Sequence, residues 1–192
     1  WPEKLVVFRE DSMKKNLALA CVAAIALAGC GGGGGGGSSD SGAAAPPMGR
    51  QLTGTPGTDH LESTPGADAF DGGAGYDYAR YDNAKAGVTV DMGNPSRNTG
   101  EAAGDTYVNI EGIAGSLFDD NITGNDKGND LHGQAGNDVV SGAGGNDVVG
   151  GEAGDDRLDG GPGADTYMGG PGADTFIFRR GEAQGDSITD FE

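Results

Sequence analysis

The sequence is poor in cysteine, aromatic residues and basic residues. Two cysteines among 192 residues are too few for a disulfide-stabilised scaffold, and aromatic residues make up only 6% of the chain. The 12 basic residues stand against 30 acidic ones, which gives a formal net charge of -18. Because nucleic acid is a polyanion that such a surface repels, no nucleic-acid partner is expected. The apolar run at residues 17–28 is too short to span a bilayer comfortably.

Glycine is abundant instead, with 40 residues. It does not recur at every third position, which excludes a collagen triple helix. A conventional packed core is not expected at this glycine content. The composition therefore leaves two classes, a disordered chain or a repeat fold that makes use of glycine and acidic residues.

Met13 opens a segment with the organisation of a signal peptide. Two lysines and the apolar run 17–28 follow it, and the sequence LAGC ends at Cys30. This ending resembles the bacterial lipobox, in which the signal is cut before the cysteine and the cysteine is then acylated. The resemblance implies that residues 13–29 are a lipoprotein signal peptide and that Cys30 carries a lipid, which anchors the chain to the bacterial outer membrane. A plain secretory signal, or a buried helix that ends in cysteine, is the alternative.

Two further segments belong to this N-terminal region. Residues 1–12 are interpreted as sequence upstream of the true start, because Met13 has the features of an initiator. Residues 30–53 are dominated by Gly, Ser, Ala and Pro and have no apolar period. They are predicted to form a disordered tether that holds a folded module away from the membrane.

A nine-residue period begins at Gly54. Three nonapeptides fill residues 54–80, each with Gly fourth, Asp sixth and an apolar residue eighth. Seven uninterrupted nonapeptides, the later repeats, follow over residues 115–177; their eighth residues are Ile122, Leu131, Val140, Val149, Leu158, Tyr167 and Phe176. In the second of them, residues 124–132, Asn129 takes the sixth position and the Asp has slipped to Asp130, which weakens the prediction of an ion site there.

The residue types at these positions suit a hard cation. Asp supplies a short carboxylate, and glycine allows positive φ, so that carbonyl oxygens can point at an ion. The pattern closely resembles the RTX family, the hemolysin-type calcium-binding repeats GGxGxDxUx. The resemblance implies an all-β fold, a right-handed parallel β-roll in which two repeats make one turn. Loops of alternate repeats then stack on one edge, with several calcium ions between them.

The calcium ligands that follow from this resemblance are the sixth-position aspartates and the fourth-position glycines of the later repeats. Ions between loops two repeats apart would pair Asp138 with Asp156, Asp147 with Asp165, and Asp156 with Asp174. The full predicted set is Asp59, Asp68, Asp77, Asp120, Asp138, Asp147, Asp156, Asp165, Asp174, Gly136, Gly145, Gly154, Gly163 and Gly172.

Calcium is expected to be necessary for folding. Each repeat buries one apolar side chain, which stabilises the fold less than the ordering of nine backbone residues destabilises it. The net negative charge adds repulsion. Without cations the repeats are therefore expected to be disordered, and with calcium the free energy of binding becomes free energy of folding.

Two segments depart from the period. Residues 81–114, between the first repeat block (54–80) and the second (115–177), are predicted to form a β-ribbon that bulges from one continuous roll; a linker between two rolls is the alternative. Residues 178–192 resemble the cap that follows the last repeats in serralysin C-terminal domains. Relatives continue beyond this cap, so we expect it to be truncated here.

No catalytic motif accompanies the repeats: the HExxH helix, the GxSxG elbow and the GKS/GKT phosphate loop are missing, and His60 and His132 fall at outward-facing positions. We therefore expect no enzyme but a calcium-binding RTX protein of the bacterial envelope or extracellular space. The alternatives are a calcium-binding and secretion domain derived from a serralysin-like protease or another secreted enzyme, and a surface adhesin or matrix module. Its expected partners are calcium and, through the lipid, the membrane; a surface or extracellular protein partner stays open.

Overall fold

The computed structural model describes residues 5–9 and 49–190. The predicted signal peptide, Cys30 and nearly all of the predicted tether lie outside these residues. Within the described ranges the regular elements are short β-strands and two 3-10 turns, η1 (Pro95–Arg97) and η2 (Gly100–Ala102). No helix among the described residues is long and apolar enough to cross a membrane. The strands are β1 (Leu5–Arg9), β2 (Gln51–Thr53), β3 (His60–Glu62), β4 (Ala69–Asp71), β5 (Tyr78–Arg80), β6 (Thr89–Asp91), β7 (Thr106–Val108), β8 (Gly112–Ala114), β9 (Asn121–Thr123), β10 (Asp130–Ala135), β11 (Val139–Ser141), β12 (Val148–Ala153), β13 (Arg157–Asp159), β14 (Thr166–Met168), β15 (Thr175–Arg179) and β16 (Ser187–Ile188).

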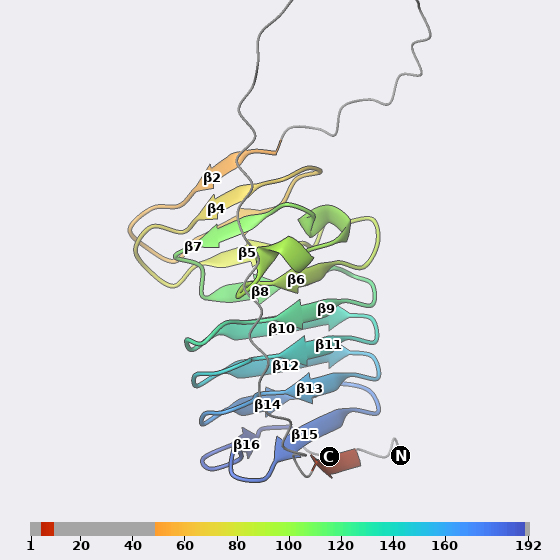
Figure 1. Ribbon diagram of the computed structural model, residues 1–192. Coiled ribbons are helices and arrows are strands. Elements are labelled where there is room, and N and C mark those ends of the chain that lie inside the picture. The colour runs from red at the N-terminus through yellow and green to blue at the C-terminus, as the bar shows by residue number, and fades with distance from the viewer. Residues whose placement is uncertain (1–4, 10–48, 191–192) are drawn as a thin grey trace, which may run out of the picture.

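Successive strands of the repeats alternate between two parallel sheets, which stack turn upon turn along the molecule (Figure 1). One sheet has the order β16-β14-β12-β10-β8-β5-β3, and the other has the order β1-β15-β13-β11-β9-β6. Val140 lies opposite Ile122 on one side and opposite Leu158 on the other, so paired residues are 18 positions apart. Two nonapeptides therefore make one turn, and the predicted all-β parallel β-roll is confirmed. A small third sheet, β2-β4-β7, lies at the N-terminal end.

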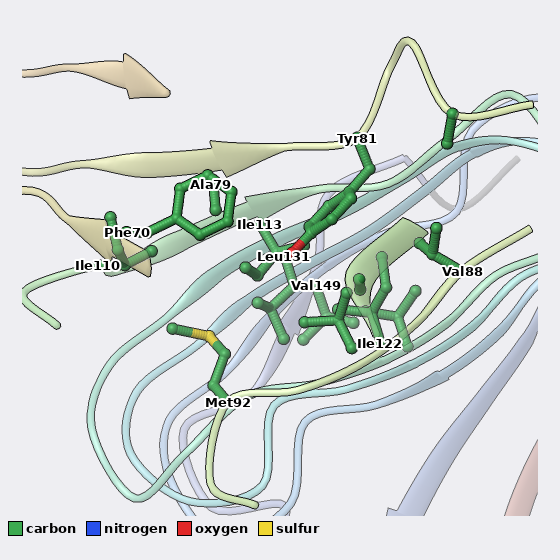
Figure 2. Close-up of a cluster of buried hydrophobic side chains, with 14 of the residues drawn as sticks. Phe70, Ala79, Tyr81, Val88, Met92, Ile110, Ile113, Ile122, Leu131 and Val149 are labelled. Atoms are coloured by element: carbon green, nitrogen blue, oxygen red, sulfur yellow. The ribbon is translucent and has the colours of Figure 1, made fainter. Parts of the chain in front are cut away.

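The eighth-position side chains line the inside of the roll (Figure 2). Ile122, Leu131, Val140, Val149 and Leu158 are each 0% exposed. Because neighbouring residues of a strand point to opposite faces, one apolar side chain per repeat is enough to fill the interior of so narrow a fold. Burial of each contributes about 1.5–3 kcal/mol.

Residues 81–114 are built into the roll. Val88 and Met92 are buried beside the repeat core (Figure 2), and β6 pairs in parallel with β9. The chain then passes through η1 and η2 to β7, which pairs with β4, and β8 pairs with both β5 and β10. The segment thus forms strands of a continuous roll, in place of the expected projecting ribbon. Its apolar residues explain this, because a ribbon would leave them in water.

At the C-terminal end of the roll, each of the two main sheets has one more strand beyond the nonapeptide repeats. β16 pairs with β14, so residues after the last nonapeptide continue the roll. In Figure 1, β1 is the red strand close to β15. The backbones of the two strands pair in parallel, with Leu5 opposite Thr175. That residues 1–12 precede the true start, and that residues 178–192 form a serralysin-type cap, stay predictions.

Candidate metal sites along the roll

The sixth-position aspartates of the later repeats are buried and stacked. Asp138, Asp147 and Asp165 are each only 1% exposed. The backbone N–H of one aspartate donates to Oδ1 of the aspartate 18 residues further on. These N to O distances are 2.8 Å from Asp138 to Asp156, 2.9 Å from Asp147 to Asp165 and 3.1 Å from Asp156 to Asp174. The structure therefore brings together the three carboxylate pairs that the spacing predicts as neighbours.

The second carboxylate oxygen of several of these aspartates faces no donor. Among the described residues, Oδ2 is buried without a hydrogen-bond partner in Asp77, Asp138, Asp147, Asp156 and Asp165. A buried carboxylate oxygen is costly unless a donor or a cation lies next to it. These oxygens therefore mark positions at which a cation would stabilise the fold.

The first-position glycines lie in close contact with these oxygens. A Cβ on Gly142 would lie 2.2 Å from Oδ2 of Asp147 and 2.6 Å from the carbonyl oxygen of Gly160 in the next turn. A carboxylate and a carbonyl thus converge beside this glycine, and a larger residue would collide with both. A Cβ on Gly133 or Gly151 would likewise lie 2.2 Å from Oδ2 of the aspartate of its own repeat. Sequence reasoning missed these glycines, although one opens every repeat from 115 to 177.

The predicted fourth-position glycines allow the loops to stack closely. Their φ angles lie between +118° and +159°, a region that glycine enters without steric cost. A Cβ on Gly154 would lie 1.7 Å from the carbonyl oxygen of Gly136, so no side chain fits between neighbouring turns. The same close approach places backbone carbonyls beside the aspartates. The set is Gly136, Gly145, Gly154, Gly163 and Gly172.

The sixth-position aspartates 18 residues apart form two stacked columns along the roll, and burial in these columns disfavours the ionised carboxylate. Burial raises the pKa of Asp138 to about 7, and the neighbouring carboxylates of Asp120 and Asp156 raise it as well. Burial likewise raises the pKa of Asp147 and of Asp156 to about 6. Within residues 49–190 no group of three or more acidic, histidine or cysteine side chains is arranged to hold a metal ion by itself. An ion would therefore be shared by carboxylates and backbone carbonyls, an all-oxygen set that suits Ca2+.

The sequence of these loops matches a known family of repeats. The family model of the RTX calcium-binding nonapeptide repeat matches in four copies, over residues 51–79, 114–149 and 151–176. These are RTX calcium-binding repeats. The comparison with curated proteins finds no match for the chain. Together with the parallel roll, the family match supports a calcium-binding repeat protein.

The aspartates of the first repeat block and Asp120 lie in the same columns, but several of them differ from the later aspartates in the hydrogen-bond partner of Oδ2. Asp59 donates from its backbone N–H to Oδ1 of Asp77 at 2.8 Å, and Asp120 does so to Asp138 at 2.7 Å. In Asp59, Asp68 and Asp120, however, Oδ2 already accepts a hydrogen bond from within its own loop. The structure therefore divides the predicted ligands into two groups.

The slipped RTX repeat keeps the column through an amide. The backbone N–H of Asn129 donates to Oδ1 of Asp147 at 2.8 Å, so Asn129 occupies the aspartate position. Asp130 lies instead on the outer face of the roll, where the hydroxyl of Tyr78 donates to it at 2.6 Å and Nε2 of His132 lies 2.8 Å from its other oxygen. The carboxylate of Asp130 is therefore engaged outside the loop column.

Acidic residues outside the regular RTX repeats continue the columns. The predicted calcium ligands did not include Glu111, and sequence reasoning also missed Asp105 and Asp186. The signal for both is a Gly-Asp pair in the flanking segments. Asp105, Glu111 and Asp186 accept from the backbone N–H groups of Asp68, Asp77 and Asp165 at 2.7, 3.0 and 3.0 Å, respectively.

A second ladder runs beside the aspartate columns and was not predicted. It consists of fifth-position side chains, and each accepts from the backbone of the next turn. Oδ1 of Asp119 accepts from the N–H of Asn137 at 2.7 Å, and Oδ1 of Asn137 accepts from the N–H of Asp155 at 2.8 Å. The available signal is the Asp or Asn that precedes the sixth-position Asp in these repeats.

Proposed function

We propose that this chain is a calcium-dependent RTX roll of the bacterial envelope or extracellular space, which folds as it binds calcium. The observation that carries the proposal is the row of buried aspartates whose Oδ2 atoms have no hydrogen-bond donor and lie against glycines. An overall charge of -18 works in the same direction, because repulsion between carboxylates opposes a compact fold without cations.

The residues that would hold the ions are the stacked aspartates of residues 133–177 together with carbonyl oxygens of the glycine-rich loops. Asp156 illustrates the arrangement: its Oδ1 accepts from the N–H of Asp138, and its buried Oδ2 has no donor. The side chain thus joins its own turn to the preceding one, and its backbone N–H donates to Asp174 in the following turn. A bound calcium ion would supply the positive charge that these oxygens lack. Binding at one turn then favours the ordered state of the next.

The proposed location rests on the N-terminal sequence. The resemblance to a lipobox at residues 27–30 supports export and acylation of Cys30, and outer-membrane anchoring follows from acylation. Calcium is plentiful outside the cytoplasm, so a roll that needs calcium would fold there after export. In this proposal the tether holds the roll clear of the lipid headgroups.

Folding on calcium binding is tested by far-UV circular dichroism of the purified chain, first in excess chelator and then during a calcium titration. We expect a β-spectrum to grow as calcium is added, and magnesium to substitute poorly because it demands a smaller octahedral shell. A full β-spectrum in excess chelator would overturn the proposal.

The anchor is tested by replacing either cysteine of the N-terminal region. Cys30→Ser should abolish labelling with a radioactive fatty acid and partition into detergent. Cys21→Ser is the matched control, because Cys21 lies inside the predicted signal peptide and would be removed with it. Labelling of the Cys30→Ser variant, or loss of labelling with Cys21→Ser, would contradict the assignment.

A further inference from the structure

The second residue of each nonapeptide separates the loops into two conformational kinds. In the loops of Asp138, Asp147 and Asp156 this residue has a left-handed backbone, although none of the three is glycine. Gln134 has φ +83°, Ala143 has φ +76° and Glu152 has φ +71°. Gly73 and Gly161, in the loops of Asp77 and Asp165, have φ +90° and +91°. In every one of these five loops the Oδ2 of the aspartate is the buried oxygen without a donor.

In the other kind of loop the second residue is Thr or Ser, and its backbone is not among those with positive φ. Its N–H then points at the aspartate four residues on. The N to Oδ2 distance is 2.6 Å from Thr55 to Asp59, 2.6 Å from Thr64 to Asp68 and 2.5 Å from Ser116 to Asp120. The sign of φ at one residue therefore decides whether this oxygen receives a hydrogen.

The hydroxyl of the same residue adds a second donor. Oγ1 of Thr64 lies 2.9 Å from Oδ1 and 3.0 Å from Oδ2 of Asp68, and Oγ of Ser116 lies 2.8 Å from Oδ1 of Asp120. The carboxylate is thus satisfied within its own loop. A hydrogen directed at Oδ2 occupies one of the two lone pairs of that oxygen and partly neutralises its charge, so it weakens the attraction of this carboxylate for a cation.

We propose that the loops of Asp59, Asp68 and Asp120 bind no calcium, and that Thr55, Thr64 and Ser116 take the place of the ion. This inference rests on the proposed function, and it revises three of the ligands that the family resemblance implies. Calcium is then confined to the loops with a left-handed second residue. These are the consecutive loops of residues 133–177 and the separate loop of Asp77.

Asn129 supports this division independently. Its loop also has a second residue whose N–H is turned inward: Asn125 donates to Oδ1 of Asn129 at 2.8 Å. The sixth position is here a neutral amide, which still donates from its backbone to Asp147. A loop in which the second residue donates to the sixth side chain therefore keeps its place in the column without any carboxylate charge. This is expected of a loop that binds no calcium, because only a calcium-binding loop needs the charge.

The test compares Asp→Asn substitutions in the two kinds of loop, because Asn keeps the shape and one accepting oxygen but removes the charge. The number of 45Ca ions bound per chain at saturation is measured by equilibrium dialysis of the full chain, and the calcium midpoint is followed by circular dichroism. The triple variant Asp59→Asn, Asp68→Asn, Asp120→Asn should bind as many ions as the parent chain at saturation, although the loss of an acceptor in each loop should raise its folding midpoint. Asp147→Asn and Asp165→Asn should each lose ions and raise the midpoint.

A substitution in the opposite direction, which should create an ion site, distinguishes loss of a site from misfolding. Thr64→Gly removes the hydroxyl and permits positive φ, so this variant should gain an ion. Loss of ions from the triple Asn variant, or no gain with Thr64→Gly in a folded chain, would overturn the inference while leaving calcium-dependent folding intact. A parent chain that binds no 45Ca at all would instead overturn the proposed function itself.

Discussion

The loops at residues 63–68 and 160–165 share the sequence Pro-Gly-Ala-Asp and differ only in their first two residues, which are Ser-Thr in one and Gly-Gly in the other. In the first loop Thr64 donates to Oδ2 of Asp68 at 2.6 Å. In the second, Gly161 has φ +91° and Oδ2 of Asp165 has no donor. Two nearly identical loops near the two ends of one roll therefore differ at the same carboxylate: in one Thr64 donates to Oδ2 of Asp68, and in the other Oδ2 of Asp165 has no donor, as the proposed calcium site requires.

The surroundings of the two loops differ in the same sense. Near the N-terminal end, Phe70 stacks on Tyr107 with a centroid separation of 5.7 Å, and the hydroxyl of Tyr81 donates to buried Asp105 at 2.7 Å. In residues 133–159 the interior has one apolar side chain per repeat beside the aspartate and fifth-position ladders, and aromatic contacts return only at Tyr167, which packs on Phe176 and Phe178. Side-chain contacts thus stabilise the N-terminal end of the roll, whereas the stability of residues 133–159 depends more on a cation that neutralises the buried aspartates.

The largest expected difference between the regions is the response to loss of one aspartate. Asp156→Ala removes both the acceptor for Asp138 and an oxygen at an open site, whereas Asp59→Ala removes a carboxylate that Thr55 already satisfies. A saturated site contributes about 2.7 kcal/mol at one hundred times its dissociation constant. Asp156→Ala should therefore raise the calcium midpoint in circular dichroism far more than Asp59→Ala. Equal midpoints would show that the columns are not calcium sites.

Truncation of a core leucine should show a smaller difference between the two regions. Leu158 is 0% exposed, whereas Leu61 at the N-terminal end is only partly buried. Leu158→Ala should cost about 2–5 kcal/mol of unfolding free energy, the range for a fully buried leucine, and Leu61→Ala should cost less. Urea unfolding in saturating calcium measures both. If Leu61→Ala cost as much as Leu158→Ala, the N-terminal turn would have to be packed more tightly than its exposure indicates.

The repeat period was sufficient to predict the roll and its core. A glycine, an aspartate and an apolar residue at fixed offsets place the eighth side chain inward, and Ile122 and Leu158 are buried as expected. The aspartate pairs 18 residues apart follow from the same period, because two repeats make one turn. Regular repetition makes these features local, so they need no knowledge of distant contacts.

Two features could not be predicted because they depend on contacts that the period does not specify. Gln134, Ala143 and Glu152 adopt positive φ although their side chains disfavour it, so glycine alone does not mark the open loops. The segment 81–114 joins the roll because Val88 and Met92 are buried against other turns. A short alternating apolar pattern is equally compatible with a ribbon and with separate strands of a roll.

The stability of the calcium-free chain should depend on pH through its buried carboxyl groups. The pKa values of Asp138, Asp147 and Asp156 are raised from 3.8 to about 7, 6 and 6 in the fold. The folded state therefore holds protons that the unfolded state has released, and folding without calcium loses stability as the pH rises from about 4 to about 7. In chelator, circular dichroism should show more β-structure at about pH 5.5 than at about pH 7.5.

Asp138→Asn should flatten this dependence, because the amide does not titrate. In saturating calcium the sign should reverse, since protons compete with the ion for the same oxygens. A chelated chain that is less folded at the lower pH would show that the buried carboxylates do not control its stability.

The smallest expected effect concerns the hydroxyl that replaces an ion. Thr64→Val removes the Oγ1 contacts of 2.9 and 3.0 Å to Asp68 but leaves the backbone N–H in place. Hydrogen bonds to charged groups contribute about 1.5–3 kcal/mol, and partial exposure at Thr64 should bring the loss to the lower end of that range. Thr166→Val is the matched control, because its hydroxyl makes only an exposed 3.4 Å contact with Ser187. Urea midpoints at two calcium concentrations, both above the folding midpoint, should show the same decrease for Thr64→Val, since this loop binds no ion. A decrease that shrinks as calcium rises would instead place an ion at Asp68.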